Sequence, residues 1–476
     1  MILSFFLSNY DILVLNCKLF IEGVFFMFQN NKILILGFAR SGYSAAKVLI
    51  ERGNTVILND ARSEDKMDSS QVEELKNLGV QLIFGSHPDD LLDSSFQYLI
   101  KNPGVPIDHK YVLKAKKLGV EVINEVEMAY HLLPKDVSII GITGTNGKTT
   151  TTTITYEIMK KAFGEKVHLA GNIGFPLSSI LKDVKKEDII VMECSCQQGE
   201  NFIDFHPHVG VLTNFSEAHI DFMKTYEHYK EVKAKMFYQQ SEDDICIMNY
   251  DNSDVVEELN DVISHKKYFS HLEKVDGCYL KDGYIYYNDE KVLSIESIKI
   301  KGMHNVENCM AAICAVKEYG VSNDIIASVI SEFRGVEHRL EYVDTVRGVE
   351  YYNDTEATNI KCCQIALSSF QKPIILFLGG LERGQNFDEL IPFMEHVKTI
   401  MAIGECRERV EKFSKKIGKD VYVYEHLVDA FDKTVEISQE GDVVLLSPAS
   451  ASWDQYKECE VRGREFKQKV EELKKG

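Results

Sequence analysis

The sequence lacks the usual marks of a disulfide-stabilised, nucleic-acid-binding or membrane-spanning protein. None of its 11 cysteines forms a C-x-x-C pair, and no secretory signal is recognisable, which is typical of reduced thiols in the cytoplasm. Positive charge is in deficit, because the formal net charge is −19 and no concentrated basic patch could bind a polyphosphate backbone. No uncharged stretch reaches the ~18 residues that a membrane span needs. We therefore expect a cytoplasmic protein with no nucleic-acid partner and no stable membrane insertion.

The chain contains enough apolar residues to build several domains. Its 476 residues are 45% hydrophobic and 27% charged, which is typical of a globular protein too long for one ordinary domain. Residues 1–28 are the exception, because they are apolar and aromatic but are interrupted by Asp11, Lys18 and Glu22. We interpret them as an extension before the first domain, with a true start at Met27 or a peripheral membrane anchor as alternatives.

Alternating strands and helices predict three α/β blocks with no Gly/Ser-rich linker between them. A hairpin-like stretch over 283–300 precedes a helix that starts near His304. Further helices are expected near 43–52 and 225–240. The predicted strands are 32–36, 55–58, 137–140, 188–193, 209–213, 374–378, 399–403, 421–424 and 443–446.

A glycine-rich segment at the start of the second block has the properties of a phosphate-binding loop. It reads GITGTNGKTT over 141–150, between a predicted strand and a predicted helix. Such a turn directs backbone N–H groups and the positive end of a helix at phosphate oxygens, with a lysine on the phosphates and a hydroxyl on Mg²⁺. The strict G-x-x-x-x-G-K-[ST] pattern misses by one residue, because Ile142 stands in the place of the first glycine. The candidate nucleotide-binding residues are Gly144, Thr145, Asn146, Gly147, Lys148, Thr149 and Thr150.

A second glycine turn, in the first block, raises an alternative function. Gly37-x-Ala39-x-x-Gly42 falls one residue short of the dinucleotide fingerprint G-x-G-x-x-G, and Asp60 follows at the distance of a ribose contact. A nicotinamide-dependent oxidoreductase is therefore the obvious rival. The phosphate-binding loop in the second block argues against it, because a simple dehydrogenase has no use for that loop.

The GTNGKT run resembles the Mur ligase family, whose superfamily also includes the folylpolyglutamate synthases. The resemblance extends over nearly everything after residue 30, and its final motif is similar to the branch of the family that adds D-glutamate. Each motif alone is moderately specific, but their number and order make a strong case. The matching segments are 171–174 (GNIG), 302–308 (GMHNVEN), 337–339 (EHR), 353–354 (ND), 379–384 (GGLERG) and 446–457 (LSPASASWDQYK).

This resemblance implies a three-domain α/β fold and an ATP-dependent ligase. A Rossmann-like domain over 29–130 would bind the UDP of the substrate, and a central P-loop-type ATPase domain would occupy 131–335. A C-terminal Rossmann-like domain over 336–476 would bind the amino acid. The family forms an amide bond by activating a carboxylate as an acyl phosphate. The expected substrates are ATP, UDP-N-acetylmuramoyl-L-alanine and D-glutamate, with two Mg²⁺ ions and a monomeric enzyme.

The resemblance also assigns site residues to this sequence. Lys148, Glu193, His219 and Lys233 are the implied catalytic residues, with Lys233 carbamylated, because a carbamate supplies the oxygen ligands that Mg²⁺ prefers. Read from the sequence alone, Lys233 is only one lysine on an amphipathic helix, and His219 could be a core histidine. The implied metal ligands are Thr149, Glu193, His219 and Lys233; Asn308, Arg339 and Asp354 are implied on ATP, between domains two and three; and Asp60, Arg62, Asn172, Ser195, Gln198, Thr358, Arg383 and Ser452 are implied on the substrates.

The sequence departs from the family pattern at residues expected near the amino-acid substrate, which is the acceptor of the reaction. Glu356 stands where the family usually has Lys, and Cys459 replaces an aromatic residue. Exchanging a cation for an anion beside a dicarboxylate reverses a Coulomb term of roughly a few kcal/mol at intermediate dielectric. Two alternatives therefore stay open: a ligase with altered acceptor choice, and a binding protein with impaired catalysis. A folate polyglutamylase is a further rival, although the UDP-type first domain argues against it. Zinc on Cys194-x-Cys196 and His206-x-His208 is a further alternative, although neither spacing matches a zinc knuckle.

Overall fold

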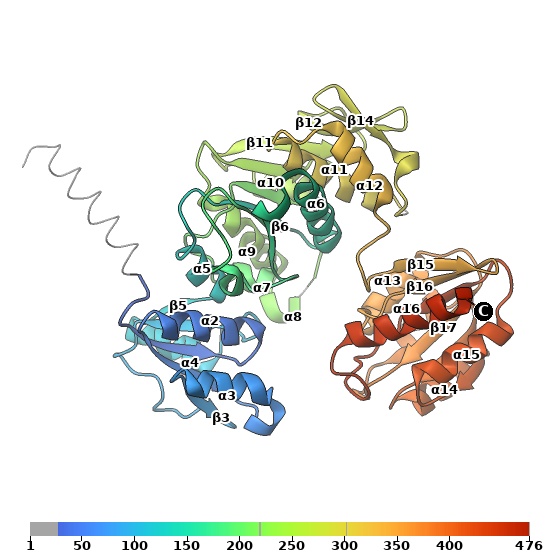
Figure 1. Ribbon diagram of the computed structural model, residues 1–476, viewed down its shortest axis with the longest axis horizontal. Helices are drawn as coiled ribbons and strands as arrows, with labels where there is room; N and C mark the ends of the chain where they lie inside the picture. The colour runs from blue at the N-terminus through green and yellow to red at the C-terminus, as the bar shows by residue number, and fades with distance from the viewer. Residues whose placement is uncertain (1–26, 219, 301, 476) are drawn as a thin grey trace, which may run out of the picture. The chain divides into compact units, whose positions relative to one another are not determined.

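The computed structural model describes residues 27–218, 220–300 and 302–475, which form three β-sheets with helices packed around them (Figure 1). The predicted fold class is confirmed. The chain divides into two compact units, one ending at Glu332 and one beginning at Phe333. Of the predicted extension only Met27 and Phe28 are described; residues 1–26 lie outside the described part. No helix among the described residues has the length and apolarity to cross a bilayer.

The first sheet is a five-stranded parallel sheet with the order β3-β2-β1-β4-β5. Its strands read as continuous apolar runs because both faces are covered. The order reverses between β1 and β4, which is the point where open parallel sheets bind ligands, outside the carboxyl ends of the strands. The elements are β1 (Lys32–Leu36), α2 (Arg40–Glu51), β2 (Thr55–Asp60), α3 (Ser69–Asn77), β3 (Gln81–Phe84), β4 (Tyr98–Lys101), α4 (Lys110–Leu118), β5 (Glu121–Ile123) and α5 (Glu125–Tyr130).

The second sheet has nine strands in the order β14-β13-β12-β11-β10-β9-β6-β8-β7. Its strands pair in parallel from β7 to β12, and the predicted hairpin over 283–300 is confirmed as the antiparallel pair β13–β14. The strands are β6 (Ser138–Thr143), β7 (Val167–Gly171), β8 (Ile189–Glu193), β9 (Val209–Leu212), β10 (Ile245–Asn249), β11 (His265–Ser270), β12 (Gly277–Lys281), β13 (Tyr284–Tyr287) and β14 (Glu290–Ser294).

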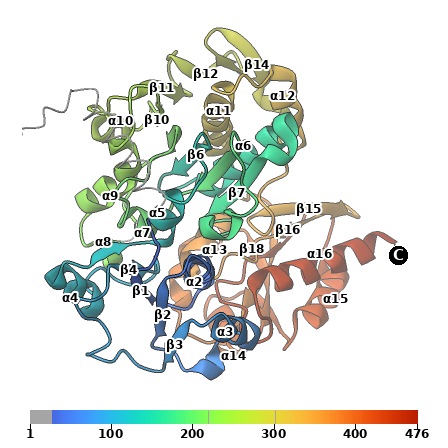
Figure 2. The ribbon, with the colours of Figure 1, turned by 60° about the vertical axis from the view of Figure 1, so that its left-hand side comes forward.

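Two helices of this block, α6 (Lys148–Phe163) and α11 (Met303–Lys317), lie side by side (Figure 2). The other helices are α7 (Cys196–Gly199), α8 (Ile220–Met223), α9 (Tyr226–Tyr238), α10 (Ser253–Glu258) and α12 (Asn323–Glu332). The first two blocks share one hydrophobic core, which runs from Ile33 and Leu49 through Met128 to Leu177 and Ile190. They therefore belong to the same compact unit.

The C-terminal unit is built on a six-stranded sheet with the order β15-β16-β20-β17-β18-β19. Only the β15–β16 pair is antiparallel, and separate hydrophobic clusters cover the two faces. The elements are β15 (Glu341–Val346), β16 (Val349–Asn353), α13 (Ile360–Ser368), β17 (Ile374–Gly379), β18 (Val397–Ile403), α14 (Arg407–Lys416), β19 (Asp420–Val423), α15 (Leu427–Ile437), β20 (Val443–Leu446) and α16 (Cys459–Lys475).

Candidate active site

The phosphate-binding loop joins β6 to α6, as the sequence predicts. Gly147 is the N-cap of α6; it has no side-chain capping bond, and the first turn contains no acidic residue. The positive end of the helix is therefore not neutralised by a carboxylate from the same turn. Lys148, Thr149 and Thr150 lie partly buried in this first turn, where the helix end and their polar groups suit a polyphosphate.

Side chains from distant segments hold the loop in place. The Thr145 N–H donates to the Asn214 carbonyl at 2.8 Å, and the Asn146 N–H donates to Asn214 Oδ1 at 3.0 Å. The Tyr229 hydroxyl on α9 donates to Thr145 Oγ1 at 2.9 Å. Tyr229 was not predicted as a supporting residue; its spacing of four from Lys233, on one helix face, was the available signal.

Two glycines are required because other side chains pack against the loop. A Cβ on Gly144 (φ +145°) would lie 1.9 Å from Thr213 Oγ1, and one on Gly147 (φ +80°) would lie 2.1 Å from Asn308 Oδ1. Asn308 lies on α11, so the structure brings this predicted ATP contact against the phosphate-binding loop.

Glu193 ends β8 and is fully buried. Its Oε1 accepts a hydrogen bond from Asn172 Nδ2 at 2.6 Å, whereas Oε2 has no hydrogen-bond partner among the described residues. A buried carboxylate oxygen without a donor is costly unless a cation or another donor satisfies it. The site of Glu193 therefore suits a metal ion.

Lys233 is buried beside the same loop. Its Nζ donates to the Gly144 carbonyl at 2.6 Å and to Thr143 Oγ1 at 3.4 Å. Burial, and then the nearby charge of Lys148, lower the pKa of Lys233 to about 7, because both disfavour the ammonium form. The predicted ligand His219 lies outside the described residues.

Ser195 and Gln198 form a capping box at the start of α7. The Gln198 N–H donates to Ser195 Oγ at 3.3 Å, and the Ser195 N–H donates to Gln198 Oε1 at 2.8 Å. Asn124, the N-cap of α5, donates from Nδ2 to the Gln198 carbonyl at 2.5 Å. The first block therefore helps to fix α7.

Asp60 and Arg62, which are predicted to contact the UDP-linked substrate (the acyl donor), are bonded to each other at the end of β2. Arg62 Nη2 lies 2.8 Å from Asp60 Oδ2, which also accepts the Phe38 N–H at 2.8 Å. Burial raises the pKa of Asp60, but the hydrogen bonds from Arg62 and from Phe38 outweigh burial and leave that pKa lowered. This ion pair fixes the glycine turn of the first block above β1.

In the C-terminal unit, Asp354 is buried after β16 and accepts the Leu340 N–H at 3.0 Å and the Ser447 hydroxyl at 2.7 Å. Burial raises the pKa of Asp354 to about 7, although both hydrogen bonds and the charge of Arg339 oppose the rise. Arg339 is half-exposed, and its Nη2 lies 3.9 Å from Glu356 Oε2. Asp354 therefore titrates near neutral pH.

The predicted acceptor contacts lie on loops of the same unit. Thr358 is partly buried beyond β16, and the Arg383 guanidinium lies 4.7 Å from the centre of the Trp453 ring. Ser452 is buried, and its hydroxyl has no hydrogen-bond partner within the described chain. The Ser452 hydroxyl and the Arg383 guanidinium are both groups that can donate hydrogen bonds to a carboxylate.

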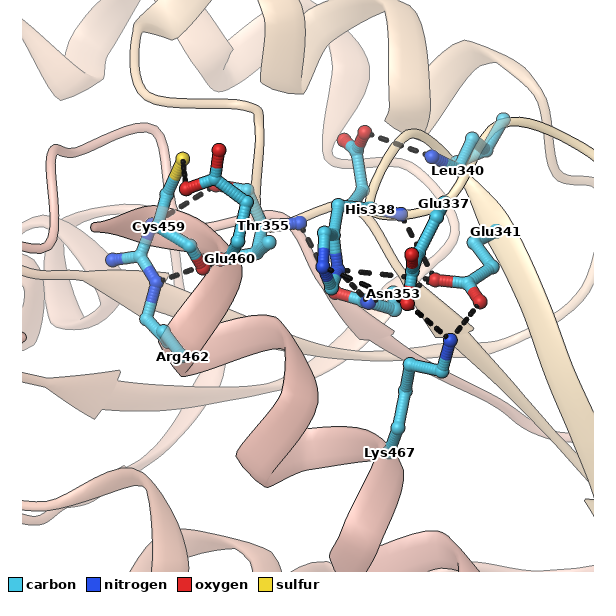
Figure 3. Close-up of polar contacts among 11 residues, drawn as sticks. Glu337, His338, Leu340, Glu341, Asn353, Thr355, Cys459, Glu460, Arg462 and Lys467 are labelled. Atoms are coloured by element: carbon cyan, nitrogen blue, oxygen red, sulfur yellow. Dashed lines mark hydrogen bonds and ion pairs between the residues drawn. The ribbon is translucent and has the colours of Figure 1, made fainter. Parts of the chain in front are cut away.

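Arg462 holds two of these loops together, as Figure 3 shows in part. It is fully buried, and its guanidinium donates to Thr355 Oγ1 at 3.0 Å, to the Thr355 carbonyl at 3.0 Å and to the Ser450 carbonyl at 3.1 Å. This role of Arg462 was not predicted, because an arginine on an amphipathic helix is normally exposed.

Comparisons with known proteins show the family to which the chain belongs. Three domain families match successive parts of the chain: the Mur ligase MurD-like N-terminal domain over 31–124, the Mur ligase middle domain over 142–316, and the Mur ligase glutamate ligase domain over 338–450. The chain belongs to the Mur ligase family.

The curated relatives of this Mur ligase cover almost its whole length. It is 45% identical over 94% of the chain to the UDP-N-acetylmuramoylalanine--D-glutamate ligase of Enterococcus hirae, of which it covers 97%. It is 41% identical over 94% of the chain to the ligase of the same name from Bacillus pumilus, of which it covers 99%. The crystal structure of UDP-N-acetylmuramate-alanine ligase MurC from Thermotoga maritima shares the fold, with a TM-score of 0.55, 16% identity and coverage of 93% of this chain and 99% of that chain.

The structure brings the two departures of this Mur ligase from its family pattern close together. Ligand atoms of Glu356, Cys459 and Glu460 all lie within 4.8 Å of one another. The Cys459 thiol lies 3.4 Å from Glu460 Oε2, and burial raises the pKa of Cys459 to about 12. Arg339 is an ion-pair partner of Glu356. The clusters of potential metal ligands in the described residues include none of the residues weighed above for zinc.

Proposed function

We propose that this protein joins D-glutamate to UDP-N-acetylmuramoyl-L-alanine with conversion of ATP to ADP and phosphate, a step of cytoplasmic peptidoglycan synthesis. The observation that carries the proposal is the 40–45% identity to ligases of that name over 94% of the chain. The phosphate-binding loop with Glu193 and Lys233 beside it supports the ATP-dependent chemistry.

The reaction needs two steps because a carboxylate is a poor acyl donor. The terminal carboxylate oxygen of the donor attacks the γ-phosphorus of ATP, the bond to ADP breaks, and an acyl phosphate forms. The deprotonated amine of D-glutamate then attacks the acyl carbon, and the tetrahedral intermediate releases phosphate. The N-terminus of α6 and Lys148 stabilise the charge that develops on the transferred phosphoryl group.

Mg²⁺ would neutralise charge on the phosphates and polarise the phosphoryl oxygens. The donor set fits it, because Glu193 presents a buried oxygen without a protein partner and oxygen ligands suit this hard cation. We assign Thr149, Glu193, His219 and Lys233 as the residues that would hold two ions.

Lys233 would join that set as a carbamate. With its pKa lowered to about 7, a large fraction of the side chain is the neutral amine at physiological pH. The amine nitrogen attacks the carbon of CO₂ and loses a proton, which turns a cation into an anion with two ligand oxygens. The burial that makes a lysine ammonium costly is offset once the carbamate binds Mg²⁺.

The remaining residues would bind the three substrates. Asn308, Arg339 and Asp354 are assigned to ATP, and Asp60, Arg62, Asn172, Ser195 and Gln198 to the UDP-linked donor. For the acceptor we assign Thr358, Arg383 and Ser452, because a cation and an unsatisfied hydroxyl complement a carboxylate. The active species is a monomer.

One assay tests the function. ADP and phosphate formation is measured with ATP, Mg²⁺, UDP-N-acetylmuramoyl-L-alanine and a panel of amino acids. We expect turnover with D-glutamate. Turnover with another acceptor only, or donor binding without turnover, would favour the second candidate, a diverged member with altered acceptor choice or impaired catalysis. The cluster of Glu356 and Cys459 is the observation behind that candidate.

A further inference from the structure

Helix α2 is tied to the central block by a ladder of polar contacts. Arg40, Ser44 and Glu51 lie on one face of α2, because spacings of four and seven residues return to the same side of a helix. They contact residues spaced by four on the opposing segment. The rungs are Arg40 Nη2 to the Gly174 carbonyl, Ser178 Oγ to Ser44 Oγ at 2.8 Å, and Lys182 Nζ to Glu51 Oε2 at 2.7 Å.

The Arg40 rung differs from the others because it joins the glycine turn of the first block to a loop of the candidate active site. Arg40 is the first residue of α2 and lies within that turn, between Gly37 and Gly42. That turn is held on the end of β2, where Phe38 is bonded through its N–H to Asp60 and through its carbonyl to Arg62 Nη2 at 2.7 Å. One end of the rung therefore lies where the UDP part of the substrate is expected to bind.

The other end of the rung lies on a loop that is hydrogen-bonded to Glu193, the proposed metal ligand. Gly174 lies in a loop closed by the hydrogen bond from the Gly171 N–H to the Phe175 carbonyl at 2.9 Å. The loop needs glycine at 174 (φ +71°), since a Cβ there would lie 2.9 Å from Leu169 Cγ. Asn172 in the same loop bonds Glu193 twice, through its N–H to the carbonyl at 2.9 Å and through Nδ2 to Oε1 at 2.6 Å.

We propose that Arg40 is a positioning residue for the donor, which holds the loop over 171–175 at a fixed distance from the glycine turn. The proposal rests on the proposed function, because only a substrate that reaches from the glycine turn to Glu193 needs both the turn and the loop over 171–175. We call these two segments the walls of the donor site. Its nucleotide end binds at the turn, and its carboxylate must lie at the metal site. A guanidinium–carbonyl hydrogen bond between the walls prevents their drift, and small misplacements of reacting groups are costly.

The test compares two ligands on four proteins: wild type, Arg40→Ala, Arg40→Lys and Lys182→Ala. Calorimetry measures the dissociation constants of UDP alone and of UDP-N-acetylmuramoyl-L-alanine. We expect Arg40→Ala to weaken the full donor about tenfold, the usual worth of one charge-assisted hydrogen bond, and to leave UDP unchanged, because UDP contacts one wall only. Arg40→Lys should recover part of the loss, since it keeps a charged donor.

Lys182→Ala is the matched control, because it removes the rung of the same ladder that lies farthest from the turn. It should leave both dissociation constants unchanged. An unchanged donor affinity in Arg40→Ala, an equal loss for UDP alone, or an equal loss in Lys182→Ala would each overturn the positioning role. If the Arg40 variants lose donor affinity as expected but wild type gives no product with D-glutamate, the proposed ligation fails while the positioning of the donor by Arg40 is retained.

Discussion

At the scale of single residues, two buried side chains have a pKa far from the usual value, and one buried carboxylate lacks a full set of hydrogen-bond partners. Lys233 has a pKa lowered to about 7, and Asp354 has a pKa raised to about 7, in both cases first of all by burial. Glu193 keeps one buried oxygen without a protein donor. Such groups cost stability and are retained where ligands satisfy them.

We expect Lys233→Ala to lower kcat about a hundredfold or more, because the variant removes the proposed carbamate ligand to Mg²⁺. A short-chain carboxylic acid added to the assay should restore part of the activity by supplying the missing oxygens. Lys235→Ala on the same helix is the control, since Lys235 Nζ donates to the Glu200 carbonyl at 3.0 Å and not to the phosphate-binding loop among the described residues. Full turnover in Lys233→Ala without added acid would contradict the carbamate.

Asp354 predicts a pH dependence of stability. Its folded-state pKa of about 7 lies above the ordinary value of 3.8, so its contribution to stability is complete below about pH 4 and is lost as the pH rises through 7. We expect Asp354→Asn to raise the Tm of the C-terminal unit at pH 8 and to change it little at pH 4. Asparagine keeps an acceptor for the Leu340 N–H. A variant that melts at or below the wild-type temperature at pH 8 would show that the ionised Asp354 carboxylate does not destabilise the folded unit.

At the scale of elements, the ends of strands and helices decide where function lies. β6, β8 and α6 bring the phosphate-binding loop to Glu193, and α9 and α11 add Tyr229, Lys233 and Asn308 around it. The predicted strands are all present, with ends displaced by no more than three residues. Strands such as β7 and β11 were not predicted, because His168, His265 and Lys266 interrupt their apolar pattern.

The two ends of α6 allow a matched test of the loop. We expect Gly147→Ala to weaken ATP binding more than about tenfold, since its Cβ would meet Asn308 Oδ1 and the residue would be held at positive φ. Gly164→Ala, at φ +63° with open space around it, should cost stability only. ATP affinity is measured by calorimetry and stability by thermal melting. Equal ATP affinity in the two variants would contradict the role of the loop.

At the scale of the whole molecule, the first two sheets share a core while the C-terminal sheet has cores of its own. The boundaries predicted at 130/131 and 335/336 stay a prediction, and the compact units separate after Glu332. The first two blocks should therefore unfold together, because one continuous core does not melt in halves.

Met128 tests this shared core. It is fully buried on α5, where the first block meets the second. We expect Met128→Ala to destabilise the unit by about 2–5 kcal/mol and to shift a single calorimetric transition that includes both sheets. The C-terminal transition should not move, and Met394→Ala in its own core is the reciprocal control. Separate transitions for the first and second sheets would contradict a shared core.

The amino-acid sequence by itself determined the local features of this protein: the three α/β blocks, the phosphate-binding loop before α6, and the family motifs, including the departures at Glu356 and Cys459. These follow from spacings of a few residues, where periodicity, glycine and side-chain type act directly. Tertiary structure alone decided that Arg40 meets Gly174, that Asn308 meets Gly147, and that Asp354 is buried enough to change its pKa. Contacts between residues far apart in the chain, and the burial they produce, depend on how whole layers pack.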